Sequence, residues 1–404
     1  MKKDPATIQT ILERNATHVT DRNSLAQKLV SGKKLRVKLG MDPTAPDLHI
    51  GNAVTLWKLR EFQDAGHAII FIIGDFTTQI GDPSGRSAVR PPLTKEEISR
   101  NAKTYFTQVG KVLDIKKAEI RRNSEWLSKI HLSDWLGILK LFTAQRILER
   151  DDFAKRLKEQ KEVWMHELMY PLVQAYDSVA IKADVEIGGN DQLFNLMAGR
   201  TLLERLGKTP QDILTTEILV GTDGTRKMSK SLGNYIGITE SPRMMFGKTM
   251  SIPDSLIMSY FRLTTRRPEE EIKRVEARLQ KGENPRDVKL DLASAIVELY
   301  HGEASALRER TEFVKVFSKK QLPSDVQEAV IASGSYEVVA LLLDVGLARS
   351  KSEARRLIEQ GGIEIIPAGG AAYRPTTSAE FVAVAPGMVI RAGKTRFLKL
   401  RERL

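Results

Sequence analysis

The apolar run HAIIFIIGDF at residues 67–76 most constrains the fold, because it suits a buried strand and falls far short of a membrane span. A shorter apolar run, LRVKLG at 35–40, precedes it and ends in glycine. The segment from Gly51 to about Ala65 lies between the two runs and has the pattern of a helix. This strand–loop–helix–strand order predicts a βαβ unit and therefore a parallel α/β sheet.

Two polar segments follow these predicted strands. HIGN at 49–52 comes after the first strand, and the loop TTQIGDPSG at 77–85 comes after the second. Ligands bind such sheets at the carboxyl ends of the strands, so both segments are expected in a ligand site.

The rest of the chain predicts further domains, because 404 residues are too many for one compact core. Residues 5–30 predict an amphipathic helix ahead of the sheet, and the highly charged residues 93–165 predict a mostly helical insertion. Strand-like runs return at 179–187 and 213–221. We therefore expect a sheet domain over residues 1–242.

The character of the sequence becomes helical past Pro242, and residues 268–282 predict a helix that starts at a proline and ends before a glycine. A last module spans 337–404 and carries eleven Lys/Arg against seven Asp/Glu. It predicts a capped helix from Ser350, followed by short strands at 363–366, 380–385 and 396–400. This basic module is compatible with RNA binding and equally with a plain capping domain.

The composition narrows the class of protein. A net charge of +12 favours a polyanionic partner such as nucleic acid, although a lysine-rich surface is often only solvated. The absence of cysteine excludes disulfides and thiolate–metal sites, and the six histidines show no metal-ligand spacing. The N-terminal sequence lacks a signal-peptide core, so a cytoplasmic protein without membrane spans is expected.

The segment GMDPTAPDLHIGN predicts a phosphate site. Gly40 lets a ligand approach the backbone closely, and Thr44 lies in the following turn. His49 and Asn52 stand one helical turn apart at a helix start, where free N–H groups and the helix dipole favour anions. The alternative is that Asp47 caps the helix and His49 only packs nearby.

A second segment, KMSKS at 227–231, places Lys227 and Lys230 on a short polar loop. Such a mobile cationic loop suits charge that develops on pyrophosphate in a transition state. Taken alone, a lysine-rich loop is more often a solvated surface. The pairing with HIGN favours the binding of a nucleoside triphosphate.

A third group of polar side chains predicts a second half of the site. Tyr170, Gln174 and Asp177 fall on one face of a predicted helix, where a core-facing stripe would be apolar. The segment GGNDQ at 188–192 and Asp82 add further carboxylate and amide groups. Carboxylates repel triphosphate, so these groups suit an ammonium group, ribose hydroxyls or a phenol.

HIGN and KMSKS resemble the two signatures of class I aminoacyl-tRNA synthetases. Together with IGDPSGR and YPLVQAYDSVAIKADVEIGGNDQ, they closely resemble the bacterial tyrosyl-tRNA synthetases over about residues 35–404. The resemblance implies a Rossmann-like parallel-sheet catalytic domain (1–242) with a helical insertion at about 93–165. It also implies an α-helical anticodon-binding domain (243–330) and a small α+β RNA-binding domain of the S-four type (337–404).

The resemblance further implies an ATP-dependent ligase that activates L-tyrosine and transfers the tyrosyl group to tRNA. Magnesium would accompany ATP, with no metal site of the protein's own. A homodimer is implied as well, and the apolar residues of 133–142 offer either its interface or packing within the insertion.

Residue roles follow from the resemblance position by position. Asp177 would accept the tyrosine hydroxyl; Tyr170, Gln174 and Asp82 would bind the α-ammonium; Gln192 would lie near the carboxylate. Gly40, Asp42 and Gly51 would line the adenylate pocket, with Gly189 and Asp191 near the ribose. The triphosphate would meet Thr44, His49, Asn52, Lys227 and Lys230. Arg86 and Arg90 match basic positions used near pyrophosphate and the tRNA acceptor end.

Two positions depart from the family pattern. The last signature position, usually histidine, is Asn52, whose amide can still donate a hydrogen bond. A tyrosine that shares the substrate hydroxyl in many members aligns with Lys38, so phenol recognition would depend more heavily on Asp177.

Three other functions remain open at this point. A tryptophanyl-tRNA synthetase would share the fold, although the polar face of Tyr170, Gln174 and Asp177 suits a phenol. A small-molecule nucleotidylyltransferase would share HIGN but would not need the basic terminal module. A catalytically inactive, synthetase-derived RNA-binding protein would not need Lys227 and Lys230.

Overall fold

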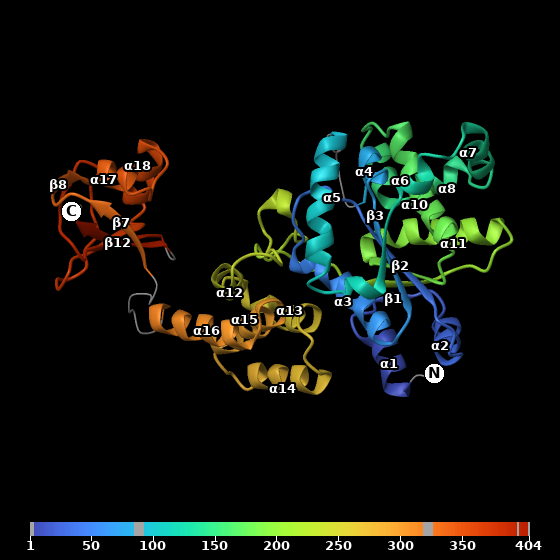
Figure 1. The fold of residues 1–404 in the computed structure, drawn as a ribbon, viewed down its shortest axis with the longest axis horizontal. Helices are drawn as coiled ribbons and strands as arrows, with labels where there is room; N and C mark the ends of the chain where they lie inside the picture. Colours follow the sequence, from blue (N-terminus) through green and yellow to red (C-terminus); the bar gives the residue numbers. More distant parts are fainter. Residues whose placement is uncertain (1–3, 85–92, 318–325, 394–395, 403–404) are drawn as a thin grey trace. The chain divides into compact units, whose positions relative to one another are not determined.

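A six-stranded sheet organises the first part of the molecule (Figure 1). The structure, a computed structural model, describes residues 4–84, 93–317, 326–393 and 396–402. The strands lie in the order β1-β6-β5-β2-β3-β4, and only β1 runs antiparallel to its neighbour. Their bounds are β1 His18–Val19, β2 Arg36–Met41, β3 Ala68–Ile73, β4 Ala118–Arg122, β5 Val185–Gly189 and β6 Asp212–Thr216. The predicted parallel α/β sheet is thus confirmed.

The strand order reverses between β2 and β5, which is where open parallel sheets bind ligands. From β2 the chain passes through α3 (Ile50–Asp64) to β3, and from β5 it passes through α11 (Leu193–Arg205) to β6 on the opposite side. Because both crossovers are expected to be right-handed, α3 and α11 cover opposite faces of the sheet, as Figure 1 shows. β3 is apolar, and β3, β5 and β6 are almost completely buried, as expected of strands covered on both faces.

The structure corrects three sequence-based predictions. The expected helix over 5–30 is two helices, α1 Pro5–Glu13 and α2 Arg22–Val30, because the chain turns at Asn15 and Asp21 caps a new helix. The insertion is mostly helical as predicted, but it also contributes a strand, β4, whose charged side chains suit a half-exposed sheet edge. The apolar run at 179–187 is shared between the end of a helix and β5, with Lys182 in the left-handed conformation between them.

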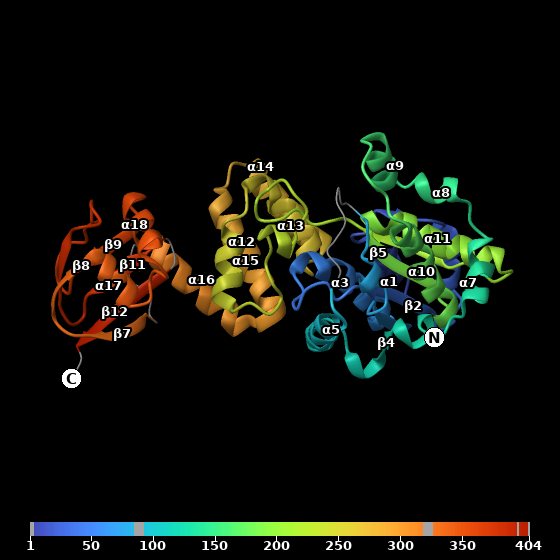
Figure 2. The same ribbon diagram turned by 90° about the horizontal axis from the view of Figure 1, so that it is seen from above.

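Helices surround the sheet and extend beyond it. Between β3 and β5 they are α4 Thr77–Ile80, α5 Lys95–Val109, α6 Ser124–Leu127, α7 Leu132–Leu139, α8 Ala144–Leu148, α9 Asp151–Lys158 and α10 Met165–Ile181. After β6 come α12 Pro242–Met250, α13 Ile257–Thr264, α14 Glu269–Gln280, α15 Pro285–His301 and α16 Glu303–Phe317. The helix predicted over 268–282 is α14, and α12 packs against α15 (Figure 2).

The chain divides into two compact units, Met1–Glu309 and Arg310–Leu404. The boundaries expected at 242/243 and between 330 and 337 stay predictions. Within the described residues, no helix has the length and apolar character needed to cross a membrane.

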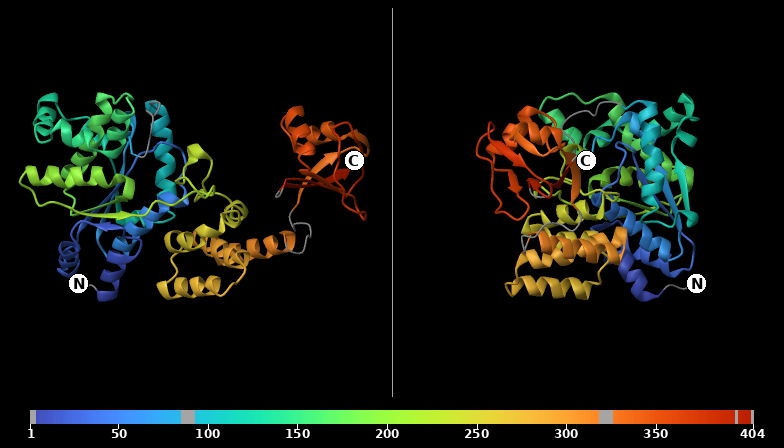
Figure 3. Two further views of the ribbon diagram at one scale, coloured as in Figure 1. Left: turned by 180° about the vertical axis from the view of Figure 1, so that it is seen from behind. Right: turned by 60° about the vertical axis from the view of Figure 1, so that its left-hand side comes forward.

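The second unit is a small α+β module with its own core (Figure 3). Its sheet has the order β7-β12-β11-β9, and β10 pairs with β8. The elements are β7 Gln327–Ile331, β8 Gly334–Glu337, α17 Val338–Asp344, α18 Lys351–Glu359, β9 Ile363–Ile366, β10 Phe381–Val384, β11 Val389–Ala392 and β12 Arg396–Glu402. Ser350 caps α18 by accepting from the Glu353 N–H (3.2 Å), as predicted. Leu341, Leu342 and Ile390 are fully buried between the helices and the sheet.

Candidate active site

A cavity of about 370 Å³ lies at the carboxyl ends of β2, β3, β5 and β6. It brings together every predicted site residue that the structure describes: Gly40, Asp42, Thr44, His49, Gly51, Asn52, Asp82, Tyr170, Gln174, Asp177, Gly189, Asp191, Gln192, Lys227 and Lys230. Arg86 and Arg90 lie outside the described residues. A side chain on Gly40 would have open space around it, so the glycine widens the cavity at the end of β2.

His49 and Asn52 form a capping box at the start of α3. The Asn52 N–H donates to Nδ1 of His49 (3.2 Å), and the His49 N–H donates to Oδ1 of Asn52 (3.2 Å). The helix cap is therefore His49 and not Asp47, because the imidazole nitrogen takes the place of a short carboxylate. Asn52 also has a structural role here that explains how an amide occupies this position.

The cap defines the protonation state of His49. Since Nδ1 accepts a hydrogen bond, we assign the proton to Nε2, the other ring nitrogen. Burial, reinforced by the nearby charges of Lys230 and Lys227, lowers the pKa of His49 to about 4. At neutral pH the ring is an uncharged donor beside the cavity.

The HIGN and KMSKS segments form one structural unit. The Ile50 N–H donates to the Ile236 carbonyl (2.9 Å), and the Ile238 N–H donates to the Leu48 carbonyl (3.0 Å). A Cβ on Gly51 would lie 3.4 Å from Cβ of Met228, so the lysine loop packs directly on the helix start. The cations of one segment are thereby held beside the N–H groups of the other.

Each signature lysine is paired with a carboxylate. Lys227 Nζ lies 3.4 Å from Asp191 Oδ2, and Lys230 forms an ion pair with Asp47. Burial raises the pKa of Asp191, and the Lys227 charge opposes that rise. Both pairs hold their ammonium groups at the cavity wall, within reach of a bound anion.

A buried carboxylate, Asp177, lines the same cavity. Asp177 on α10 accepts from Nε1 of Trp126 (2.8 Å) and from Nδ2 of Asn123 (3.4 Å). Burial raises its pKa to about 7; the Lys38 charge and these two hydrogen bonds oppose the rise, and Glu186 adds to it. Asp177 is thus a buried acceptor at the cavity wall, where a hydroxyl group in the cavity can donate to it.

Tyr170 and Asp42 connect α10 to the end of β2. The Tyr170 hydroxyl donates to Oδ2 of Asp42 (2.9 Å), and Thr77 donates to Oδ1 of the same carboxylate (2.6 Å). Burial, with Asp42 next in effect, raises the pKa of the Tyr170 phenol. Gly74 makes this contact possible, since a Cβ there would lie only 2.0 Å from Asp42 Oδ1.

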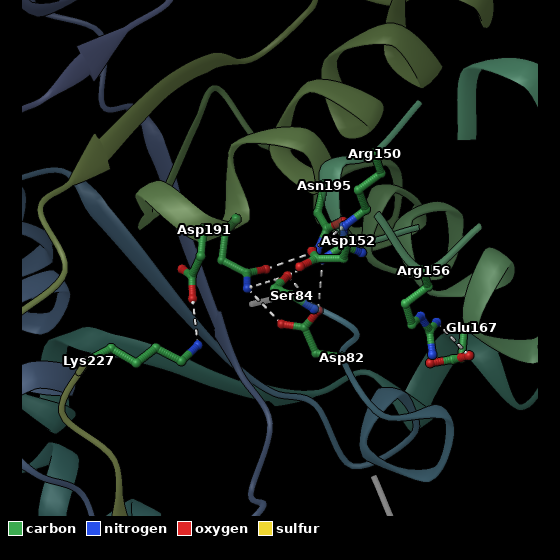
Figure 4. Close-up of polar contacts among 10 residues, drawn as sticks. Asp82, Ser84, Arg150, Asp152, Arg156, Glu167, Asp191, Asn195 and Lys227 are labelled. Atoms are coloured by element: carbon green, nitrogen blue, oxygen red, sulfur yellow. Dashed lines mark hydrogen bonds and ion pairs between the residues drawn. The ribbon is translucent and has the colours of Figure 1, made fainter. Parts of the chain in front are cut away.

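Arg150 of the helical insertion supports the cavity wall by contacting Asp82 and Ser84 (Figure 4). Asp82 accepts from Nε2 of Gln192 (2.7 Å) and from the Ser84 hydroxyl (2.7 Å). Arg150 is almost fully buried, donates to Ser84, and lies 3.4 Å from Asp82. This cluster fixes the carboxylate of Asp82 next to Gln192 at the cavity wall.

Sequence reasoning overlooked Asn123, Trp126 and Arg150 because the whole of 93–165 was assigned to an insertion. A usable signal was present at NSEW (123–126), a polar turn directly after β4, where strand ends meet in a parallel sheet. Arg150 carries no such signal in its local sequence. Among the described residues, no group of three or more His, Cys, Asp or Glu side chains is arranged to hold a metal ion.

The cavity combines three chemical environments: neutral and cationic donors suited to phosphate, a hydrogen-bonded carboxylate suited to an ammonium group, and a buried acceptor suited to a hydroxyl. This combination on a parallel α/β sheet defines a class I aminoacyl-tRNA synthetase. A family model for class I tRNA synthetases (W and Y) matches residues 31–318, and the chain belongs to that family.

Relatives of this chain include curated tyrosine–tRNA ligases. The enzyme of Thermotoga maritima is 52% identical over 88% of this chain and 88% of its own. That of Oleidesulfovibrio alaskensis is 48% identical over 97% of this chain and 98% of its own. A crystal structure of tyrosyl-tRNA synthetase from Archaeoglobus fulgidus complexed with L-tyrosine is similar with a TM-score of 0.61, at 25% identity over 76% of this chain and 100% of that chain.

Proposed function

We propose that this chain is an ATP-dependent tyrosine–tRNA ligase, which forms tyrosyl-adenylate and transfers the tyrosyl group to the 3′ end of tRNA(Tyr). One observation carries the substrate assignment: the buried carboxylate of Asp177 lines the same cavity as HIGN and KMSKS. A phenol that enters this cavity adds a hydrogen bond to those that Asp177 accepts from Trp126 and Asn123, whereas phenylalanine excludes water from the carboxylate and offers no donor in its place. The missing hydrogen bond at a buried acceptor is costly, and this cost is the physical basis of the selectivity.

The tyrosine subsite combines groups from three segments: α10, the loop that carries Asp82 and the turn that carries Gln192. Asp177 accepts the phenolic hydroxyl, and Tyr170, Gln174 and Asp82 bind the α-ammonium group. Asp82 is already held by Gln192, so its carboxylate is oriented before substrate arrives. The Gln192 amide then lies beside the reacting carboxylate of tyrosine.

The ATP subsite lies where α3 meets the lysine loop. Gly40, Asp42 and Gly51 line the adenylate pocket, and Gly189 with Asp191 lies near the ribose. Thr44, His49 and Asn52 meet the triphosphate together with Lys227 and Lys230, supported by the shared wall of these segments. Magnesium enters with ATP as part of the substrate complex. Arg86 and Arg90 complete this proposal from outside the described residues.

Catalysis then requires orientation and charge stabilisation. The tyrosine carboxylate attacks the α-phosphorus of ATP, pyrophosphate leaves, and the terminal ribose hydroxyl of tRNA later accepts the tyrosyl group. Nε2–H of His49 donates to phosphate oxygens, and Lys227 and Lys230 exchange their carboxylate partners for the leaving pyrophosphate. Fixed donors of this kind stabilise charge as it develops, without a covalent nucleophile from the protein.

The remaining proposals concern assembly and location. Residues 243–330 would form an anticodon-binding domain, and the α+β module at 337–404 would bind RNA through its basic surface. Leu132 and Leu136 of α7 are 74% and 49% exposed, which supports an apolar homodimer contact, while Ile138 of the same helix packs inward. We place the protein in the cytoplasm.

Pyrophosphate exchange into ATP tests this function with tyrosine, phenylalanine and tryptophan as separate substrates. Exchange should depend on tyrosine and be nearly absent in Asp177→Ala, with the exposed Asp344→Ala as a matched control. Exchange driven by tryptophan would favour a tryptophanyl enzyme. Exchange with no amino acid would favour an inactive RNA-binding protein.

A further inference from the structure

A buried ion pair lies directly behind the cavity. Lys38 on β2 and Glu186 on β5 are joined by a 2.8 Å contact, and their side chains are 0% and 2% exposed. Neither residue belongs to the cavity lining. Because two buried charges are costly to desolvate, the pair needs an explanation beyond general stability.

The pair is bonded to the helix that carries the tyrosine subsite. The Lys38 ammonium group donates to the Ser178 hydroxyl (2.8 Å) and to the Gln174 carbonyl (3.3 Å), both on α10. Glu186 accepts from Ser178 (3.0 Å) and from Nε2 of Gln174 (3.3 Å). All three donors of the ammonium group therefore have acceptors, and the position of α10 depends on both charges.

Gln211 and Gly199 pack against the Glu186 end of the Lys38–Glu186 network. Gln211, just before β6, donates to Glu186, and Gly199 of α11 packs against both. A Cβ on Gly199 would lie 2.8 Å from Nε2 of Gln211 and 3.3 Å from Oε2 of Glu186. Because Gly199 leaves no space for a side chain, the Glu186 and Gln211 side chains are closely packed beside α11.

The same pair acts electrostatically on Asp177. The groups that face this carboxylate are Lys38 from β2, Glu186 from β5, Trp126 from α6, Asn123 just before it, and Tyr170 from its own helix. The Lys38 charge favours the ionised carboxylate and outweighs the opposing charge of Glu186. The pair is thus neutral as a whole but favours the anion at Asp177.

We propose that Lys38 and Glu186 are positioning residues for substrate specificity: together they hold α10 and favour the anionic form of Asp177, which accepts the substrate phenol. The inference rests on the proposed activation of tyrosine. It assigns a role to Lys38, which acts through Asp177 and not by touching substrate.

Three variants of the full-length chain test the proposal by titration with tyrosine between pH 5.5 and 9. Tyrosine binding should fall as pH drops through the pKa of Asp177. In Lys38→Met the midpoint of this fall should move to higher pH, whereas in Glu186→Gln it should move to lower pH. The double variant Lys38→Met/Glu186→Met keeps the interior neutral and should still shift upward, because the lysine effect is the larger.

The preference for tyrosine over phenylalanine should drop about tenfold at pH 7 in Lys38→Met, since a protonated Asp177 is a poorer acceptor. Lys58→Met is the matched control, because Lys58 is equally buried and pairs with Glu61 (2.6 Å) away from the cavity. It should lower the melting temperature without moving the midpoint. If the methionine variants do not fold, Glu186→Gln decides the question.

Shifts in the same direction for Lys38→Met and Glu186→Gln, or unmoved midpoints, would overturn the proposal. Pyrophosphate exchange by the unmodified chain tests the proposed function separately from the role of the Lys38–Glu186 pair. No tyrosine-dependent exchange would reject the proposed function, whereas normal exchange with unmoved midpoints would reject the role of this pair alone.

Discussion

Replacing His49 separates its role as a helix cap from its proposed role as a phosphate donor. Asparagine at this position keeps an acceptor for the Asn52 N–H, because asparagine is among the best N-cap residues. Alanine removes the acceptor and should destabilise the fold by about 1 kcal/mol at pH 7.5. Both changes remove the imidazole Nε2–H, but only alanine leaves no side-chain donor in its place. Alanine should therefore slow adenylate formation by about 10²–10³-fold, the range for loss of one transition-state donor.

The low pKa of His49 adds a test at acidic pH. An unfolded histidine binds its proton near pH 6.5, whereas burial lowers the folded value to about 4. The contribution of neutral His49 to stability is therefore complete above pH 6.5 and is lost as pH falls toward 4. The loss reaches about 3 kcal/mol at most, at about 1.4 kcal/mol for each tenfold change in proton affinity.

Urea unfolding at pH 7.5 and pH 5, combined with stopped-flow measurement of adenylate formation, checks both roles. His49→Asn should match the unmodified protein at pH 7.5 and lose less stability at pH 5, by about 2 kcal/mol. Its rate should exceed that of His49→Ala, because the amide retains a donor. Full activity of His49→Ala would refute the donor role. Equal acid sensitivity in all three proteins would refute the buried neutral imidazole.

Three further predictions concern other parts of the structure. Gly74→Ala places a Cβ 2.0 Å from Oδ1 of Asp42 and should displace the carboxylate that accepts from Tyr170 and Thr77. Because Tyr170 is proposed to bind the α-ammonium group, loss of these hydrogen bonds to a charged group should raise KM for tyrosine in pyrophosphate exchange about tenfold or more. An unchanged KM would contradict this. Trp126→Phe removes the 2.8 Å donor to Asp177 and raises the pKa of that carboxyl group, so calorimetric titration should find tyrosine binding weakened more at pH 7 than at pH 8.5. Leu342→Ala empties a fully buried position and should cost about 2–5 kcal/mol in the second unit, seen by scanning calorimetry, while exchange activity persists.

The sequence was sufficient for features that depend on local periodicity. The run at 67–76 is apolar on both faces, so it predicted a strand inside a parallel sheet and the edge at which ligands bind. Tyr170, Gln174 and Asp177 follow the period of a helix, so their common face could be anticipated before α10 was seen. HIGN and KMSKS were first paired by their shared suitability for a nucleoside triphosphate, and the family resemblance then supported one site; periodicity does not supply this pairing.

Features that depend on partners distant in sequence were not predictable in this way. β4 is an edge strand with half-exposed charges, so it has no apolar signal, and Asn123 was hidden with it. Periodicity indicates which face a residue occupies but not which side chain it meets. The bond from Trp126 to Asp177 and the contact of Arg150 with Asp82 required the packed structure.

The backbone pairing of residues 48–50 with residues 236–238 has a consequence for synthesis of the chain on the ribosome. The N–H of Ile50 finds its acceptor only in Ile236, which is translated much later. A nascent chain that ends before this residue has α3 but lacks the segment that holds its first turn. The phosphate-binding wall therefore assembles only after most of the first unit has been synthesised, so a ribosome-stalled fragment ending at residue 230 should fold its early strands and still bind no ATP.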